Sequence, residues 1–170
     1  MIIDKRGKEK ESVELFKDWY NNFNHGDFQI MDFEEQEIDY LLISSSNKSN
    51  KIKLQITTCD HNIILAHCEA KKNPGEVIAF DSMHEQLISK AIIAKSLKYP
   101  VSLQKELVLL VWSDMARFNS NYIRKLTNQA CKKTSFKEIY LLELPSNKYN
   151  KSYPLKEGNV ICLKTNLHQS

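Results

Sequence analysis

The side chains most able to do chemistry are a carboxylate and two neutral polar groups on otherwise apolar strands. Asp39 belongs to residues 37–43, and Gln55 and Thr57 belong to residues 52–58. Both segments are β-prone and the residues between them are polar and turn-forming, which predicts a β-hairpin. The three side chains then meet at one end of the hairpin. They are either the start of a chemical site or ordinary strand residues satisfied by backbone donors.

The register of the hairpin decides which side chains face one another. A turn centred near Asn47 and Lys48 places Asp39 roughly opposite Ile56. Because side chains alternate along a strand, the two polar residues of the second arm share one face, and Ile56 takes the other.

This pattern resembles the PD-(D/E)XK nuclease superfamily, the restriction-endonuclease-like fold. In that pattern, an acid on one strand is followed across a hairpin by acid-x-Lys. Asp39 matches the first acid, with Ile38 before it rather than proline. Gln55-Ile56-Thr57 stands where acid-x-Lys is expected. One carboxylate and the lysine of the pattern are therefore replaced.

The resemblance implies a protein that acts on nucleic acid as a Mg²⁺-dependent phosphodiesterase. Mg²⁺ in such a site stabilises charge on the scissile phosphate and activates water. It prefers hard oxygen ligands and usually takes one or two carboxylates. Here Asp39 and the Ile56 carbonyl would be ligands, and Gln55 would offer an amide oxygen. Thr57 supplies no charge, so the resemblance also implies a degenerate site.

Two compensations follow from the resemblance. A further acid often comes from the first helix, where Glu14 borders the apolar stripe and Glu11 lies nearby. The lysine can come from a neighbouring element, and Lys95 falls one turn after Ala91 on the inward side of its helix. Other candidate lysines are Lys71, Lys72 and Lys90. The predicted catalytic residues are Asp39, Gln55, Thr57, Glu14 and Lys95, and the predicted metal ligands are Asp39, Gln55, Ile56 and Glu14.

Two alternatives remain open. In the first alternative, the protein is a non-catalytic protein-interaction or nucleic-acid-binding module that kept the fold after losing its catalytic activity. The nuclease interpretation with Asp39 and Gln55 as ligands fails if Gln55 faces the core or if Asp39 is buried against a backbone amide. The zinc-type ligands Cys59, His61, His67 and Cys68 match no common finger spacing.

The elements that must position these residues form a mixed central sheet flanked by helices, in the order α-β-β-β-α-β-α-β. A restriction-endonuclease-like core covers about residues 8–144, and residues 145–170 extend it within one domain. The expected helices are 8–24, 81–99 and 119–134, and the expected strands are 28–33, the two hairpin arms, 62–68, 77–80, 107–112, 139–144 and 160–163. The expected buried positions of the later helices are Leu87, Ile88, Ala91, Ile92, Ala94, Leu97, Tyr122, Ile123, Leu126 and Ala130.

Composition excludes several function classes. A chain of 170 residues with 42% hydrophobic and 26% charged residues is typical of a globular domain. No apolar run approaches the roughly 18 residues of a membrane span, and the first ten residues lack the apolar centre of a signal peptide. We therefore expect a cytoplasmic protein with four reduced cysteines. Four glycines and no phosphate-binding loop indicate no nucleotide or other organic cofactor.

Overall fold

The computed structural model describes residues 5–31, 37–60, 80–114, 118–145 and 158–165, and for residues 80–85 it describes the backbone. The helices are α1 (Lys5–Asn24), α3 (Phe80–Ser96), α4 (Val101–Gln104) and α5 (Ser120–Lys133). The strands are β1 (Phe28–Met31), β2 (Tyr40–Ser44), β3 (Lys51–Thr58), β4 (Leu107–Ser113), β5 (Glu138–Glu143) and β6 (Asn159–Lys164). The short helix α4 was not expected from the sequence, because Pro100 indicated only the end of the preceding helix.

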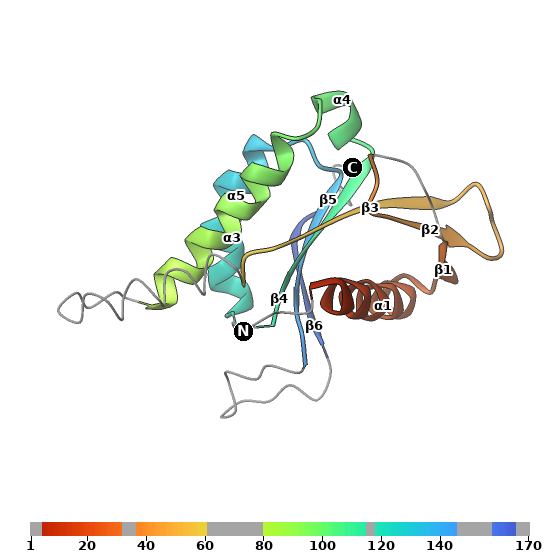
Figure 1. Ribbon diagram of the computed structural model, residues 1–170, viewed down its shortest axis with the longest axis horizontal. Coiled ribbons are helices and arrows are strands. Elements are labelled where there is room, and N and C mark those ends of the chain that lie inside the picture. The colour runs from red at the N-terminus through yellow and green to blue at the C-terminus, as the bar shows by residue number, and fades with distance from the viewer. Residues whose placement is uncertain (1–4, 32–36, 61–79, 115–117, 146–157, 166–170) are drawn as a thin grey trace.

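One six-stranded sheet runs through the molecule in the order β1-β2-β3-β4-β5-β6. The pairs β1–β2, β2–β3 and β5–β6 are antiparallel, whereas β3–β4 and β4–β5 are parallel. Helix α1 covers one face of the sheet, and α3 and α5 cover the other (Figure 1). The predicted mixed sheet flanked by helices is therefore confirmed.

The central strands are buried on both faces, as their continuous apolar sequences predict. Every residue of β4 and β5 is buried. Leu110 of β4 belongs to the cluster that α1 covers through Phe16. Its neighbour Leu109 belongs to the opposite cluster, which contains Ile92 of α3 and Ile123 of α5. The hydrophobic core thus lies in two layers on either side of these strands.

The hairpin register differs from the expected one by one residue. Tyr40 pairs with Leu54, and β2 begins at Tyr40, so Asp39 lies just before the strand. The reason is the turn, in which the Asn50 amide donates to the Asn47 carbonyl at 2.8 Å and the Ser44 amide donates to the Asn50 carbonyl at 3.1 Å. These bonds centre the turn on Asn47, so the two strands pair with a register one residue away from the expected one.

Four residues expected to be buried are exposed instead, and Ala94 of α3 is one of them. Leu97 is 82% exposed, Tyr122 45% and Leu126 40%. Leu97 follows the last residue of α3 and is no longer held on the inward side of the helix. Helix α5 buries a stripe rotated from the expected one, formed by Ile123, Thr127, Ala130 and Cys131. Thr127 can lie in this stripe because its hydroxyl donates to the Ile123 carbonyl at 2.7 Å.

Other predictions fall partly or wholly outside the described residues. The strands expected at 62–68 and 77–79, the end of the strand expected at 28–33, and the candidates Lys71 and Lys72 lie there, as do His61, His67 and Cys68. Phe80, expected to end a strand, begins α3 instead. Cys59, Cys131 and Cys162 are free thiols. Among the described helices, none is long and apolar enough to cross a membrane.

Candidate functional site

Asp39 is fixed against the middle of β3 from the turn that precedes β2. Its Oδ2 accepts a hydrogen bond from the Ile56 amide at 2.8 Å, and its own amide donates to the Leu54 carbonyl at 3.2 Å. The side chain nevertheless keeps 36% of its surface exposed. Asp39 is thus held in one orientation while its carboxylate stays accessible from solvent.

Lys95 reaches this carboxylate from the last turn of α3. Its Nζ lies 2.9 Å from Asp39 Oδ2 and 2.9 Å from the Ile56 carbonyl oxygen. Only 12% of the lysine side chain is exposed. We call Asp39, Ile56 and Lys95 the hairpin site. In it, a carboxylate oxygen and a carbonyl oxygen converge on one positive charge.

Gln55 faces the core, so the nuclease interpretation that uses Gln55 as a metal ligand is wrong. The residue has no exposed surface. Its Nε2 donates to the Glu37 carbonyl, and its Oε1 accepts from the Tyr99 hydroxyl at 2.8 Å. Both ends of the amide are therefore engaged beneath the residues that follow α3. Gln55 instead anchors the main chain of Glu37, two residues before Asp39, and so helps to position that carboxylate.

Tyr99 is a supporting residue that sequence reasoning missed. Burial, with the nearby negative charges of Asp39 and Glu37, raises the pKa of the Tyr99 hydroxyl, so the hydroxyl stays protonated and donates to Gln55. The Lys95 ammonium lies 6.0 Å from the centre of the Tyr99 ring, within cation–π range. The i, i+4 spacing of Lys95 and Tyr99 was the available signal.

Thr57, also predicted as catalytic, is not brought into the hairpin site. It is half-buried on β3 and pairs with Val111 of β4. No described hydrogen bond joins its side chain to Asp39 or Lys95. Threonine is a favoured strand former, and the positive charge beside Asp39 comes from Lys95 of α3.

Glu14 shares a cavity of about 280 Å³ with Asp39. Its side chain is 47% exposed, and its Oε2 lies 2.8 Å from Lys17 Nζ. Glu11, the other candidate acid, pairs with Lys8 at 3.0 Å and does not line this cavity. The residues that line it are Lys10, Val13, Glu14, Ile30, Met31, Asp39 and Tyr40. Of the two candidate acids, Glu14 is therefore the one that lines a cavity with Asp39.

The lysine candidates separate clearly in the structure. Lys95 contacts Asp39, whereas Lys90 lines a groove between α3 and α5. Of the candidates that the structure describes, only Lys95 therefore belongs to the hairpin site.

The donor chemistry at the hairpin site fits a hard divalent cation in part. Asp39 Oδ2 and the Ile56 carbonyl oxygen are of the type that Mg²⁺ prefers, and they already converge on the Lys95 ammonium. Gln55 does not fit, because its Oε1 is engaged in the core. Within the described ranges, no three His, Cys, Asp or Glu side chains are grouped to hold a metal. Of the predicted ligands, Asp39 and the Ile56 carbonyl lie together, whereas Glu14 lines a cavity with Asp39 and pairs with Lys17.

The zinc alternative finds no support from its one described member. Cys59 is fully buried, and burial raises the pKa of its thiol. Its three partners in the sequence pattern lie outside the described residues.

Comparisons of this chain with protein families, with curated proteins and with solved structures find no match.

Proposed function

We propose that the protein acts on nucleic acid as a metal-dependent phosphodiesterase of the restriction-endonuclease-like plan, centred on Asp39 and Lys95. The observation that carries this proposal is the contact of Lys95 with both Asp39 Oδ2 and the Ile56 carbonyl, each at 2.9 Å. It joins a helix and a hairpin that are far apart in the sequence. In this proposal, Lys95 of α3 takes the role of the lysine that the pattern expects on β3.

The strand topology supports the same plan. An antiparallel meander of three strands, β1 to β3, is followed by α3 and by β4, which is parallel to β3. Asp39 lies just before the second strand and the Ile56 carbonyl on the third, an arrangement that agrees with the resemblance. Fold alone does not imply function, so the hairpin site carries the argument.

Each residue has a separate role in the proposed reaction. Mg²⁺ held by Asp39, the Ile56 carbonyl and Glu14 would stabilise charge on the scissile phosphate and activate water. Lys95 provides a second positive charge for that phosphate. Because its Nζ now occupies both oxygens of the hairpin site, it must leave them when a cation is bound. Gln55 and Tyr99 act through the backbone of residues 37–39 and are positioning residues.

A nuclease assay tests the proposal directly. The full chain is incubated with plasmid DNA, single-stranded DNA and RNA in Mg²⁺ or Mn²⁺, beside Asp39→Asn and Lys95→Met. Matched controls are Glu106→Gln and Lys5→Met, which alter exposed members of ion pairs outside the site. We expect cleavage that needs a divalent ion and is lost in both site variants but kept in both controls. Absence of cleavage, or cleavage unchanged by Asp39→Asn, contradicts the proposal.

A second candidate function is a non-catalytic module that kept the fold. The observation that favours it is the burial of Gln55, which removes one predicted ligand from the site. For this candidate, we expect no cleavage of any of the three substrates and no effect of divalent ions on the stability of the folded chain.

A further inference from the structure

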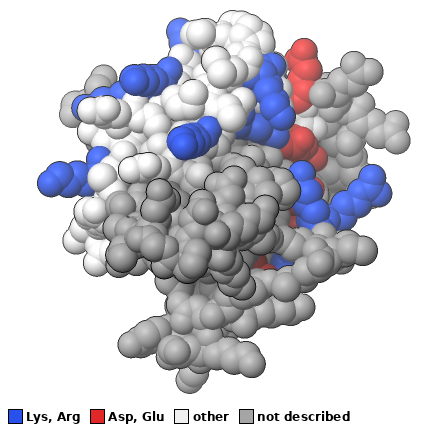
Figure 2. Space-filling model, turned by 60° about the vertical axis from the view of Figure 1, so that its left-hand side comes forward, with Lys and Arg blue, Asp and Glu red and all other residues white. Residues whose placement is uncertain are grey.

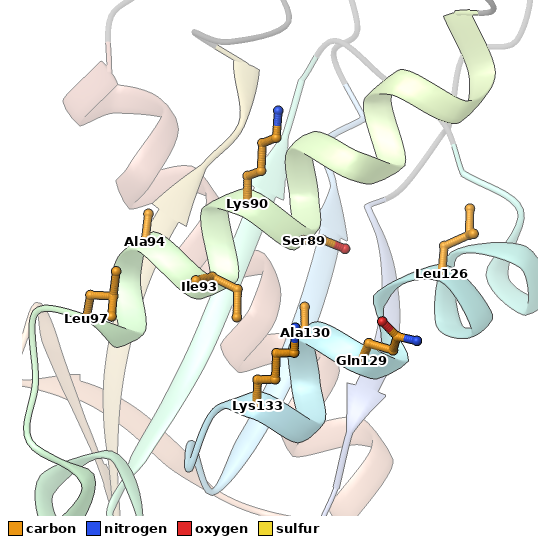
Figure 3. Close-up of a pocket in the computed structure, with 9 residues that line it drawn as sticks. All are labelled: Ser89, Lys90, Ile93, Ala94, Leu97, Leu126, Gln129, Ala130 and Lys133. Atoms are coloured by element: carbon orange, nitrogen blue, oxygen red, sulfur yellow. The ribbon is translucent and has the colours of Figure 1, made fainter.

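Helices α3 and α5 leave a groove between them on the outer surface of the molecule. It encloses about 450 Å³, and the residues that line it are Ser89, Lys90, Ile93, Ala94, Leu97, Leu126, Gln129, Ala130 and Lys133. In Figure 3, Ile93 and Ser89 project from α3 toward α5, and Ala130 faces them from below. The floor of the groove is thus apolar.

Two leucines make this groove unusual for a surface. Leu97 is 82% exposed and Leu126 is 40% exposed. Both belong to apolar stripes that predict burial, yet the sheet is already covered by other residues of the same helices. Large apolar side chains gathered in a concave patch are typical of an interaction site. The apolar faces of α3 and α5 are therefore wider than the core requires.

The two edges of the groove are positively charged. Lys90 lies on one side and Lys133 on the other, and none of the lining residues is acidic. Helix α5 carries four basic residues and no acid, Arg124, Lys125, Lys132 and Lys133. In Figure 2, the face turned toward the viewer shows Lys and Arg dispersed over uncharged surface at the upper left. An occupant must match both the apolar floor and this charge.

The apolar floor and the positive charge of the groove together discriminate between possible binding partners. A second copy docked about a two-fold axis would bring the lysines of one groove against those of the other, and like charges across an interface are costly. Nucleic acid would match the lysines, but its phosphate backbone has no group for an apolar floor. An amphipathic helix with acidic flanks matches both, because such helices insert apolar side chains into grooves between helices.

We propose that the α3–α5 groove docks an acidic amphipathic helix of a partner protein. Apolar side chains at i, i+3 or i+4, and i+7 of the partner pack against Ile93, Leu97 and Leu126. Its acidic residues face Lys90 and Lys133. This surface is separate from the hairpin site, since Lys95 leaves α3 toward β3 and Asp39. The proposal therefore stands whether or not the protein is a nuclease.

A displayed library of helical peptides tests the proposal on the full chain. The library holds one apolar stripe constant and varies the flanking residues among acidic, neutral and basic types. We expect acidic peptides to be enriched. For the best peptide, Leu126→Glu and the charge reversal Lys133→Glu should each weaken binding by at least about tenfold, as for loss of one anchoring residue. Tyr122→Glu is the matched control, because Tyr122 is exposed on the same helix and does not line the groove.

Three results would overturn the proposal. The first is enrichment of neutral or basic peptides, or of none. The second is binding that Leu126→Glu leaves unchanged while thermal unfolding shows that the variant is folded. The third is a dimer of the free chain that Leu126→Glu converts to a monomer, which would assign the groove to a second copy.

Discussion

Two carboxylates beside β3, Asp39 and Asp60, have opposite surroundings. Asp60 follows β3 and is only 2% exposed, accepting from the Ser113 hydroxyl at 2.6 Å and from the Asp114 amide at 2.8 Å. Asp39 also accepts from a backbone amide, but it keeps 36% of its side chain exposed and meets the Lys95 ammonium. The first arrangement ties two strand ends together. The second leaves a charged pair whose carboxylate is open to solvent.

Glu143 at the end of β5 extends the contrast. It is 2% exposed, and its two carboxylate oxygens accept from the Phe118 amide and, at 2.7 Å, from Asn159 Nδ2. Asp60 and Glu143 thus connect the ends of strands to neighbouring segments of the chain. An acid alone does not mark a reactive site. Asp39 differs from Asp60 and Glu143 in being partly exposed and in pairing with a lysine of another element.

The largest effect is expected from Asp39→Asn. The variant keeps the shape of the side chain and removes its charge, so we expect nuclease activity to fall by roughly 10²–10³-fold, the range for loss of one preorganised electrostatic group. The free energy of unfolding should change little, because the site is partly open to water. Initial cleavage rates and thermal unfolding measure the two quantities. Equal cleavage rates for the variant and the parent would mean that Asp39, like Asp60, has only a structural role.

Gln55→Glu introduces the acid that the resemblance expects at this position, yet we expect it to destabilise the protein. A buried carboxylate would face the Glu37 carbonyl oxygen that Gln55 Nε2 now satisfies, which costs about 2 kcal/mol at pH 7. Burial raises the pKa of the new carboxyl above its unfolded value. The folded state therefore binds the proton more tightly, and the loss of stability should shrink as the pH falls through that pKa.

Chemical denaturation at pH 7 and pH 5 checks this prediction. Gln55→Leu is the control, because its destabilisation should not depend on pH in this way. A Gln55→Glu variant as stable as the parent at pH 7, with increased activity, would show that residue 55 belongs to the ligand set after all.

Asp60→Ala should destabilise the protein without a specific effect on activity. Removal of the carboxylate leaves the Ser113 hydroxyl and the Asp114 amide without this acceptor, at a cost of about 1–3 kcal/mol. Asp39→Ala should cost less, since water can replace the exposed carboxylate. The free energy of unfolding of the two variants gives the comparison, and a larger loss for Asp39→Ala would reverse it.

Tyr99→Phe should have the smallest effect. It removes the hydrogen bond to Gln55 Oε1, which contributes about 1 kcal/mol. Because Tyr99 is a positioning residue, Tyr99→Phe should lower kcat modestly and leave the pH profile of cleavage unchanged. A shift of that profile would mean that its hydroxyl takes part in proton transfer instead.

Much of the fold could be predicted from the sequence, because apolar periodicity reports burial directly. The continuous apolar runs of β4 and β5 and the inward position of Lys95 on α3 follow from spacing alone. The hairpin register could not be predicted from spacing, because it depends on hydrogen bonds of Asn47 and Asn50 in the turn. A shift of one residue changes the neighbour of every side chain in the pair.

The candidate site was harder to predict than the strands. Asp39 and Lys95 could be chosen as candidates, but their contact depends on how α3 lies against β3. The buried state of Gln55 depends on Tyr99, which covers it from beyond the end of α3. Leu97 and Leu126 look like core residues because periodicity cannot tell the sheet from a groove between two helices.

The most direct measurement is thermal unfolding of the full chain in a titration of Mn²⁺, with Asp39→Asn and Lys95→Met beside it. A cation that binds only the folded state adds about 1.4 kcal/mol at ten times its Kd, or about 3–6 °C in Tm for a chain of this size. We predict a rise for the parent, none for Asp39→Asn, and a rise at lower Mn²⁺ for Lys95→Met, because its ammonium no longer competes for the two oxygens. A rise that persists in Asp39→Asn, or no rise in the parent and in Lys95→Met, would contradict the assignment of the hairpin site.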